Sequence, residues 1–224
     1  MRTRSASGPE HSRCRGIGGL TDDPKICSNP AKKPAQAQER AMKRTSLTHP
    51  LQIAAISAGP ALGRVGITFC PGKYDQQAMS GYWDRDLALD LDAIHDWGAA
   101  AVVTLVEQKE LTLLRVERLG EEVLRRNMLW FHFPIVDVST PNQEFEQQWD
   151  ASGNALHALL RNGRDVLVHC RGGLGRAGTI AARLLVELGM KPAIAIKHVR
   201  AVRPGAIETR AQEKYILDLS SITT

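Results

Sequence analysis

Residues 166–179 read VLVHCRGGLGRAGT, and this stretch decides the fold class of the chain. Apolar residues lead into a His-Cys pair, a loop with three glycines follows, and the sequence then continues in a helical pattern. A short β-branched apolar run of this kind is typical of a strand that is buried on both faces of a sheet. We therefore expect a central strand at residues 166–169 and a helix at about 175–188.

The sequence on both sides of this stretch alternates between strand and helix patterns. We predict strands at residues 51–56, 64–69, 100–106 and 129–135, and helices at 86–97, about 115–127, 192–202 and 208–219. Another helix is predicted to begin at residues 140–143, with Thr140 as its N-cap, Pro141 in its first position and Gln143 closing a capping box. Strands that alternate with helices indicate an α/β fold, with a mostly parallel central sheet flanked by helices.

The first 47 residues differ from the rest of the chain. They are rich in Ser, Gly, Pro, Lys and Arg and lack hydrophobic periodicity, so we expect a disordered basic extension at 1–47 and a folded domain at 48–224. Residues 1–45 hold ten Lys/Arg and four acids, whereas residues 46–224 hold 19 and 20, so the net charge of +5 belongs to the extension. Because no aromatic or helical pattern accompanies the basic residues, nucleic-acid binding is not expected.

The composition excludes several other classes of protein. Hydrophobic residues make up 43% and charged residues 24% of the chain, as in ordinary globular proteins. No apolar run approaches the roughly 18 residues needed to span a bilayer, and no secretory signal is recognised. The four cysteines, at positions 14, 27, 70 and 170, lack metal-ligand spacing. We expect reduced thiols, a cytoplasmic location, no metal and no cofactor.

The loop after the central strand has the features of an anion site. Its glycines let the backbone turn tightly and direct successive N–H groups into one hollow, to which the helix N-terminus adds partial positive charge. The Gly-Lys-Ser/Thr ending of a nucleotide-binding loop is absent. The predicted phosphate-binding residues are Arg171, Gly172, Gly173, Leu174, Gly175 and Arg176.

The anion site gives Cys170 a chemical role. Aligned amides, a helix N-terminus and an adjacent cation favour a thiolate, so we expect Cys170 to be a nucleophile at neutral pH. The planar guanidinium of Arg176 matches two oxygens of a phosphate. Together these groups predict phosphoryl transfer through a cysteinyl-phosphate. A lone cysteine would rather be a small buried hydrophobe, but the spacing Cys-x5-Arg with intervening glycines favours the functional interpretation.

His169 precedes the cysteine and is assigned a supporting role. On an extended strand its side chain points opposite to that of Cys170, so it is not expected to act as the base. Two interpretations remain open, a histidine that hydrogen-bonds the loop backbone and a histidine that simply fills the core.

These residues also carry a family resemblance. The pattern His-Cys-x5-Arg resembles the signature of cysteine-dependent protein tyrosine and dual-specificity phosphatases. HFPIVDVSTP (132–141) and PGAIETRAQEKYI (204–216) are similar to the kinase-associated phosphatases, the cyclin-dependent kinase inhibitor 3-like group, and GITFCPGK (66–73) resembles that group and its bacterial relatives. The resemblance covers about residues 50–220. It implies a protein tyrosine phosphatase-like fold and a phosphatase domain at 48–224.

The resemblance also assigns residues outside the loop. It implies a general acid upstream of the cysteine, and Asp137 fits this position, although an Asp there also stabilises a turn. Gln212 is similar to a glutamine that positions the attacking water, or else it is an exposed helix residue. Arg203 is expected to brace the cysteine loop, and Glu107 is either a supporting acid or a plain surface acid.

The predicted function is metal-independent hydrolysis of phosphomonoesters, with phosphotyrosine, phosphoserine or phosphothreonine of a phosphorylated protein as the substrate. The alternatives are a phosphoinositide or inositol phosphate phosphatase, a non-catalytic phospho-binding module and a rhodanese-type sulfurtransferase, whose loops usually place fewer residues after the cysteine. Many dual-specificity phosphatases carry Ser or Thr after the signature arginine, whereas this chain has Ala177. Thr179 is about 200° further round the helix and is not expected to face the sulfur.

Overall fold

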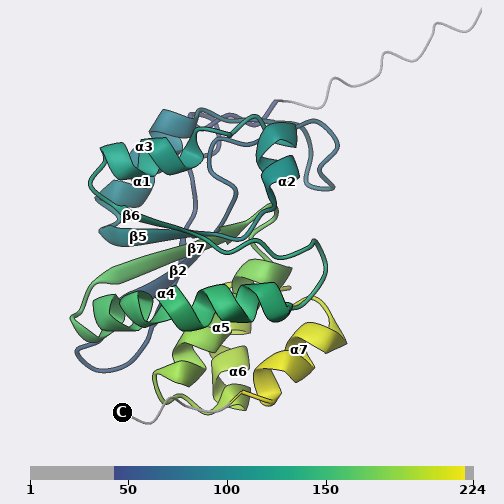
Figure 1. The fold of residues 1–224 in the computed structure, drawn as a ribbon. Helices are drawn as coiled ribbons and strands as arrows, with labels where there is room; N and C mark the ends of the chain where they lie inside the picture. Colours follow the sequence, from purple (N-terminus) through teal and green to yellow (C-terminus); the bar gives the residue numbers. More distant parts are fainter. Residues whose placement is uncertain (1–42, 220–224) are drawn as a thin grey trace, which may run out of the picture. The chain divides into compact units, whose positions relative to one another are not determined.

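The computed structural model describes residues 43–219, which form a central five-stranded sheet with helices on both faces (Figure 1). In spatial order the strands are β1 (Ala54–Ser57), β2 (Arg64–Phe69), β7 (Asp165–Cys170), β5 (Ala99–Thr104) and β6 (Leu129–His132). Only β1 runs antiparallel to its neighbour, so the mostly parallel α/β sheet predicted from the sequence is confirmed.

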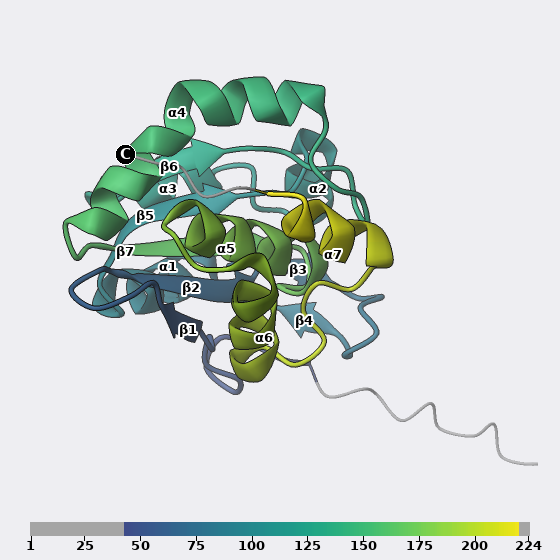
Figure 2. The same ribbon diagram turned by 90° about the horizontal axis from the view of Figure 1, so that it is seen from below.

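The helices divide into two groups, one on each face of the sheet (Figures 1 and 2). One face carries α1 (Leu87–Asp96), α2 (Gln108–Leu113) and α3 (Leu119–Arg125). The other face carries α4 (Gln143–Arg161), α5 (Gly175–Glu187), α6 (Pro192–Val202) and α7 (Arg210–Leu217). A short hairpin of β3 (Tyr74–Asp75) and β4 (Trp83–Asp84) lies outside the main sheet.

The central strand β7 shows why both faces need helices. Val166 and Val168 pack into the core under α4 to α7, whereas Leu167 packs into the core under α1 to α3. Successive side chains of a strand point to opposite faces, so a run of apolar residues must be covered on both sides. The same alternation places Cys170 on the α5 side of the sheet.

Two helix predictions need correction. The helix predicted at 115–127 covers only α3, and α2 was not predicted, because a six-residue helix is too short to show a periodic pattern. The helix predicted to start at Thr140 begins at Gln143 instead, with Asn142 as its N-cap. The side chain of Asn142 accepts a hydrogen bond from the N–H of Phe145 at 2.9 Å, and this capping bond takes the place of the one expected from Thr140.

The predicted extension of residues 1–47 lies outside the described residues except for its last five. Within these, Arg44 pairs with Trp83 in an isolated parallel bridge, and Ser46 exchanges hydrogen bonds with the backbone of Asp86. Residues 43–47 therefore contact the folded domain. None of the helices in residues 43–219 is both long and apolar enough to cross a membrane.

Candidate active site

The cysteine loop lies at the carboxyl end of β7, between the ends of two parallel neighbours. Phe69 of β2 stands opposite Cys170, and Thr104 of β5 stands opposite His169. The loop then enters α5, which begins at Gly175. Open α/β sheets bind ligands at this edge, and the helix N-terminus adds partial positive charge to it.

Gly173 shapes the loop around the sulfur of Cys170. Its φ is +69°, and a Cβ at this position would lie 2.5 Å from the backbone nitrogen of Phe69, so no other residue fits without rearrangement. The Gly173 N–H donates a hydrogen bond to the Cys170 sulfur at 3.2 Å. At Gly172, by contrast, a Cβ would meet nothing within 4 Å, so this side of the loop is open.

The guanidinium of Arg176 is buried beside the loop and is held from several sides. Glu110 accepts two hydrogen bonds, from Nη1 at 2.6 Å and from Nη2 at 2.8 Å. Nη1 also donates to the carbonyl oxygen of Ile135 at 2.9 Å, and Nη2 lies 2.9 Å from a carboxylate oxygen of Asp137. The remaining nitrogen, Nε, is buried and has no hydrogen-bond partner among the described residues.

The charges around Arg176 favour the ionised forms of both members of its ion pair. Burial opposes the charge of Arg176, but the bond to Glu110 and the negative charges of Glu110 and Asp137 raise its pKa above the ordinary value. Burial likewise opposes the charge of Glu110, but the hydrogen bonds from Arg176 and from the Glu107 backbone lower its pKa below the ordinary value. A fixed cation therefore lies next to the cysteine loop.

Asp137 lies on the loop between β6 and α4 and is half exposed. Its carboxylate accepts the N–H of Val138 at 3.1 Å, and Val138 has a φ of +62°. This conformation is strained for a β-branched residue, and backbone strain of this kind concentrates at functional sites. The strained turn brings the Asp137 carboxylate to the arginine of the cysteine loop.

Gln212 connects the Asp137 loop with α7. It is fully buried, so the alternative of an exposed helix residue is wrong. Its Oε1 accepts the N–H of Glu208 at 3.0 Å, and its Nε2 donates to the carbonyl oxygen of Ser139 at 3.1 Å. A Cβ at Gly175 would lie 3.0 Å from that Nε2 and 2.3 Å from a carboxylate oxygen of Glu208. Both side chains therefore lie against the start of α5.

His169 is fully buried between β7 and β5. Its Nε2 is hydrogen-bonded to the hydroxyl of Thr104 at 2.8 Å. Burial lowers the pKa of His169 to about 3, so the ring is neutral at pH 7 and supplies no positive charge to Cys170. The bond to Thr104 joins two strands of the core, and a role for His169 toward the loop backbone stays a prediction.

Two further arginines hold the cysteine loop. Arg203 donates from Nε to the carbonyl oxygen of Gly173 at 2.9 Å and from Nη2 to that of Gly172 at 3.2 Å, so the predicted bracing is confirmed. Arg171 directs its guanidinium to Asp75 of β3, at 3.0 Å from both Nε and Nη2. This ion pair turns Nε and Nη2 of Arg171 toward β3, and the phosphate contact that the sequence predicted for Arg171 stays a prediction.

Glu110 is a site residue that was not predicted from the sequence. The acid considered there was Glu107, which forms the N-cap of α2 and pairs with Lys109 at 3.0 Å. Glu110 is the N3 residue of the same helix and accepts the N–H of Glu107 at 2.9 Å. The Glu-x-x-Glu spacing after β5 is compatible with a capping box, and it was the available indication of a helix here.

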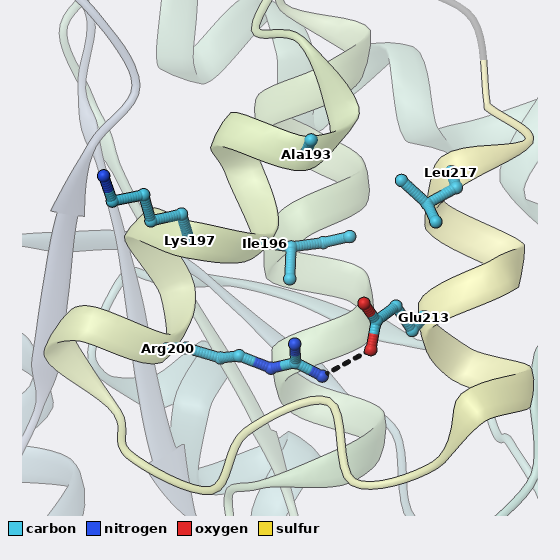
Figure 3. Close-up of a pocket in the computed structure, with 6 residues that line it drawn as sticks. All are labelled: Ala193, Ile196, Lys197, Arg200, Glu213 and Leu217. Atoms are coloured by element: carbon cyan, nitrogen blue, oxygen red, sulfur yellow. Dashed lines mark hydrogen bonds and ion pairs between the residues drawn. The ribbon is translucent and has the colours of Figure 1, made fainter.

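A groove between α6 and α7 is lined by no residue of the cysteine loop (Figure 3). It has a volume of about 380 Å³ and is lined by Ala193, Ile196, Lys197, Arg200, Glu213 and Leu217. Arg200 spans one side of it with a 2.8 Å ion pair to Glu213. The lining of the groove contains no cysteine, so it takes no part in the cysteine chemistry considered below. Within residues 43–219, no three His, Cys, Asp or Glu side chains are arranged to hold a metal ion.

The fold and the cysteine loop together define a cysteine-dependent phosphatase domain. Residues 84–216 match the family model described as Swiss Army Knife protein, DSP-PTPase phosphatase domain. The match covers more than half of the chain, which therefore belongs to the dual-specificity and tyrosine phosphatase superfamily, as the sequence resemblance indicated.

Individual relatives agree with this assignment. Cyclin-dependent kinase inhibitor 3 of Rattus norvegicus is 33% identical over 135 residues, which cover 59% of this chain and 62% of that protein. Phosphatidylglycerophosphate phosphatase PTPMT2 of Arabidopsis thaliana is 33% identical over 165 residues, which cover 67% of this chain and 68% of that protein. The matched part thus spans less than two thirds of the cyclin-dependent kinase inhibitor 3 proteins.

Solved structures show the same fold. Kinase associated phosphatase, with its catalytic-site cysteine replaced by serine, has a TM-score of 0.65 at 27% identity and covers 75% of this chain and 92% of that chain. Tk-PTP in the active form has a TM-score of 0.54 at 30% identity and covers 73% of this chain and 93% of that chain. The resemblance to the kinase-associated phosphatases therefore holds for both sequence and structure.

Proposed function

We propose that this chain hydrolyses phosphomonoesters without a metal ion, through a cysteinyl-phosphate on Cys170. The observation that supports this most directly is the buried Nε of Arg176, which has no hydrogen-bond partner within residues 43–219. Arg176 ends the loop in which the Cys170 sulfur accepts the N–H of Gly173. A buried donor without a partner is costly unless a ligand satisfies it. A phosphoryl group in the loop accepts from this Nε and from the loop amides, and it lies next to the nucleophile.

The arrangement suggests two chemical steps. The Cys170 thiolate attacks phosphorus, the bond to the leaving oxygen breaks, and protonated Asp137 gives that oxygen its proton. Water then attacks the phosphocysteine, Asp137 takes a proton from the water, and the sulfur leaves as a thiolate with release of phosphate. Arg176 and the loop amides stabilise the charge on the phosphoryl oxygens in both steps.

The ion pair between Asp137 and Arg176 indicates how the acid is released. In the structure one carboxylate oxygen of Asp137 lies 2.9 Å from Nη2 of Arg176. A phosphate that accepts from Nε and Nη2 takes over this contact, because the planar guanidinium matches two phosphate oxygens. Asp137 is half exposed, so its carboxylate has space to move towards the leaving oxygen.

The proposed substrate is a phosphorylated protein, carrying phosphotyrosine, phosphoserine or phosphothreonine. The similarity to cyclin-dependent kinase inhibitor 3 and to kinase associated phosphatase supports this class. The charges at the loop support it as well. Arg171 is neutralised by Asp75, and the exposed carboxylate of Glu208 lies against Gly175 at the start of α5. These side chains form the rim of the loop and offer no free positive charge. A headgroup with several phosphates is therefore disfavoured, whereas a peptide is tolerated.

A phospholipid monoester is the second candidate substrate. The match to the phosphatidylglycerophosphate phosphatase of Arabidopsis thaliana supports it, because that match covers two thirds of both chains. A non-catalytic phospho-binding module is the remaining alternative. We keep the cytoplasmic setting as part of the proposal, since the chemistry requires Cys170 as a reduced thiol.

The chemistry is tested with p-nitrophenyl phosphate in the presence of EDTA, for the wild type, Cys170→Ser and Asp137→Ala. We expect turnover that survives EDTA, disappears in Cys170→Ser and falls roughly 100- to 1000-fold in Asp137→Ala. No turnover by the folded wild type, with binding of a phosphate analogue, would instead establish the binding module.

The substrate class is tested by comparing kcat/KM for a phosphotyrosine peptide, a phosphothreonine peptide and vesicles that contain phosphatidylglycerophosphate. We expect a preference for the peptides. In Glu208→Gln we expect less discrimination against a polyphosphorylated inositol headgroup, because one rim carboxylate is removed. A wild-type preference for the vesicles would establish the lipid alternative.

A further inference from the structure

The β3–β4 hairpin and the turn before it contact the cysteine loop, and all but the last residue of β4 precede the family match. The chain leaves β2 at Phe69, which stands opposite Cys170 in the parallel register, and then forms the hairpin (Figure 2). The family match begins at residue 84, so Lys73 and Asp75 precede it. These two residues carry charges that the proposed mechanism does not use.

Lys73 is a buried cation that contacts the cysteine loop. Its side chain is 4% exposed, and its ammonium lies 4.9 Å and 5.0 Å from the ring centroids of Phe69 and Trp83. The ammonium donates to the carbonyl oxygen of Arg171, the residue after Cys170, at 3.4 Å. Lys73 therefore holds the peptide between Arg171 and Gly172 in the cysteine loop.

No carboxylate of the described chain forms an ion pair with Lys73, which is unusual for a buried lysine. The titratable groups around its ammonium are Asp75, Cys70, Arg171 and Cys170. Burial lowers the pKa of Lys73, while the negative charge of Asp75 opposes this decrease. The ammonium contacts the carbonyl oxygen of the residue that follows Cys170, so a thiolate at Cys170 stabilises the ammonium, and by reciprocity the ammonium stabilises the thiolate.

Asp75 holds the same loop residue by its side chain. It is 6% exposed, and one carboxylate oxygen accepts from Nε and Nη2 of Arg171 at 3.0 Å each. Lys73 and Asp75 thus contact Arg171 at two points, its carbonyl oxygen and its guanidinium. The two contacts fix the orientation of the residue that follows the nucleophile.

We propose that Lys73 and Asp75 are positioning residues of the active site, and that Lys73 additionally stabilises the Cys170 thiolate through its charge. This inference rests on the proposed function only in the identity of the nucleophile. Neither residue contacts the reacting phosphoryl group. They act on the loop peptide and on the charge of the sulfur.

The test is the pH dependence of Cys170 alkylation by iodoacetamide, followed by mass spectrometry in the full chain. Lys73→Met removes the cation, so we expect the midpoint of the profile to rise by roughly half a pH unit or more, with Lys73→Arg close to the wild type. Lys197→Met, in the α6–α7 groove, is the matched control and leaves the midpoint unchanged.

Asp75→Asn distinguishes an effect of charge from a loosened loop. It removes a negative charge and frees the Arg171 cation, so we expect its alkylation midpoint to fall while that of Lys73→Met rises. Midpoints that move in the same direction in both variants, or in neither, would overturn the proposal. If Lys73→Met does not fold, an unchanged or raised midpoint in Asp75→Asn alone overturns it.

The alkylation assay also separates this inference from the proposed function. Alkylation requires only the Cys170 thiolate and no turnover. A chain without phosphatase activity that still shows opposite shifts in the two variants would contradict the proposed function and support the positioning role. An active phosphatase in which neither variant shifts the alkylation midpoint would support the proposed function and contradict the positioning role.

Discussion

Helix α5 buries two arginines, seven residues apart, in very different surroundings. Arg183 donates from Nε to Glu187 at 2.7 Å and from Nη1 to Glu146 at 2.7 Å, contacts the hydroxyl of Tyr215, and packs 4.6 Å over the ring of Trp149. Arg176 is held by Glu110 and Asp137, but its Nε has no partner in the part of the chain that the structure describes.

The difference between the two arginines separates a structural site from a functional one. Both are almost completely buried, at 2% for Arg176 and 5% for Arg183, and both pair with carboxylates. Burial and pairing alone therefore do not indicate function, since ion pairs also form in structural networks. The Nε of Arg176 does indicate function, because it has no partner among the described residues and remains costly until a ligand in the cysteine loop accepts from it.

The largest expected effect comes from replacing each arginine by lysine. Arg176→Lys keeps one charge but loses the planar set of donors, so we expect kcat/KM for p-nitrophenyl phosphate to fall roughly 100- to 1000-fold. Arg183→Lys is expected to lower the melting temperature while kcat/KM of the folded protein stays within about twofold, because Arg183 only joins α4, α5 and α7. Equal losses of kcat/KM in both variants would show that Arg183 is not a purely structural residue.

The second prediction concerns the stability of the Arg183 network. Burial opposes the charge of Glu187, but His157 and Arg183 lower its pKa below the ordinary value. Its contribution to stability is therefore present above the ordinary carboxyl pKa and is lost as the pH falls through the lowered value. In Glu187→Gln we expect the free energy of unfolding to decrease by about 3 kcal/mol at pH 7 and by less at pH 3, measured by urea denaturation.

The control for this prediction is Glu213→Gln at the exposed ion pair with Arg200, where a change below about 1 kcal/mol is expected. A decrease that is the same for Glu187→Gln at both pH values would show that packing, rather than charge, stabilises this region.

The third prediction tests the carboxylate that orients Arg176. Glu110→Gln replaces one acceptor oxygen by an amide donor, so the guanidinium loses one of two bonds and its fixed orientation. We expect kcat/KM to fall roughly ten- to hundredfold, because a misplaced catalytic group reacts poorly. Glu107→Gln, three residues earlier at the cap of α2, is the control and is expected to stay within about twofold. A larger loss in the control would assign the effect to α2 itself.

Glu110 and Lys73 show how far the site could be predicted from the sequence. The strand, the glycines and Arg176 lie within one short stretch, so local patterns were sufficient to predict β7, the loop and α5. Glu110 lies 66 residues from Arg176, and its short helix shows no periodicity, so only the folded chain reveals the pair. Lys73 was not singled out for the same reason, since its partners come from the loop and from two aromatic rings.

The smallest expected effect concerns the residue next to Arg176. Ala177 has no hydroxyl, and Thr179 donates its own to the carbonyl oxygen of Gly175 at 2.8 Å, so neither residue supplies a proton to the departing sulfur. We expect a burst of p-nitrophenol followed by a slower steady rate, measured by stopped flow. Ala177→Ser is expected to raise the steady rate a few-fold, or about 1 kcal/mol, without changing the burst rate, because a hydroxyl hydrogen bond to the sulfur stabilises only the second step. A single linear phase that Ala177→Ser leaves unchanged would mean that breakdown of the phosphocysteine is not rate-limiting. The contribution of α5 to catalysis would then come from Arg176 and from the amides at the N-terminus of the helix.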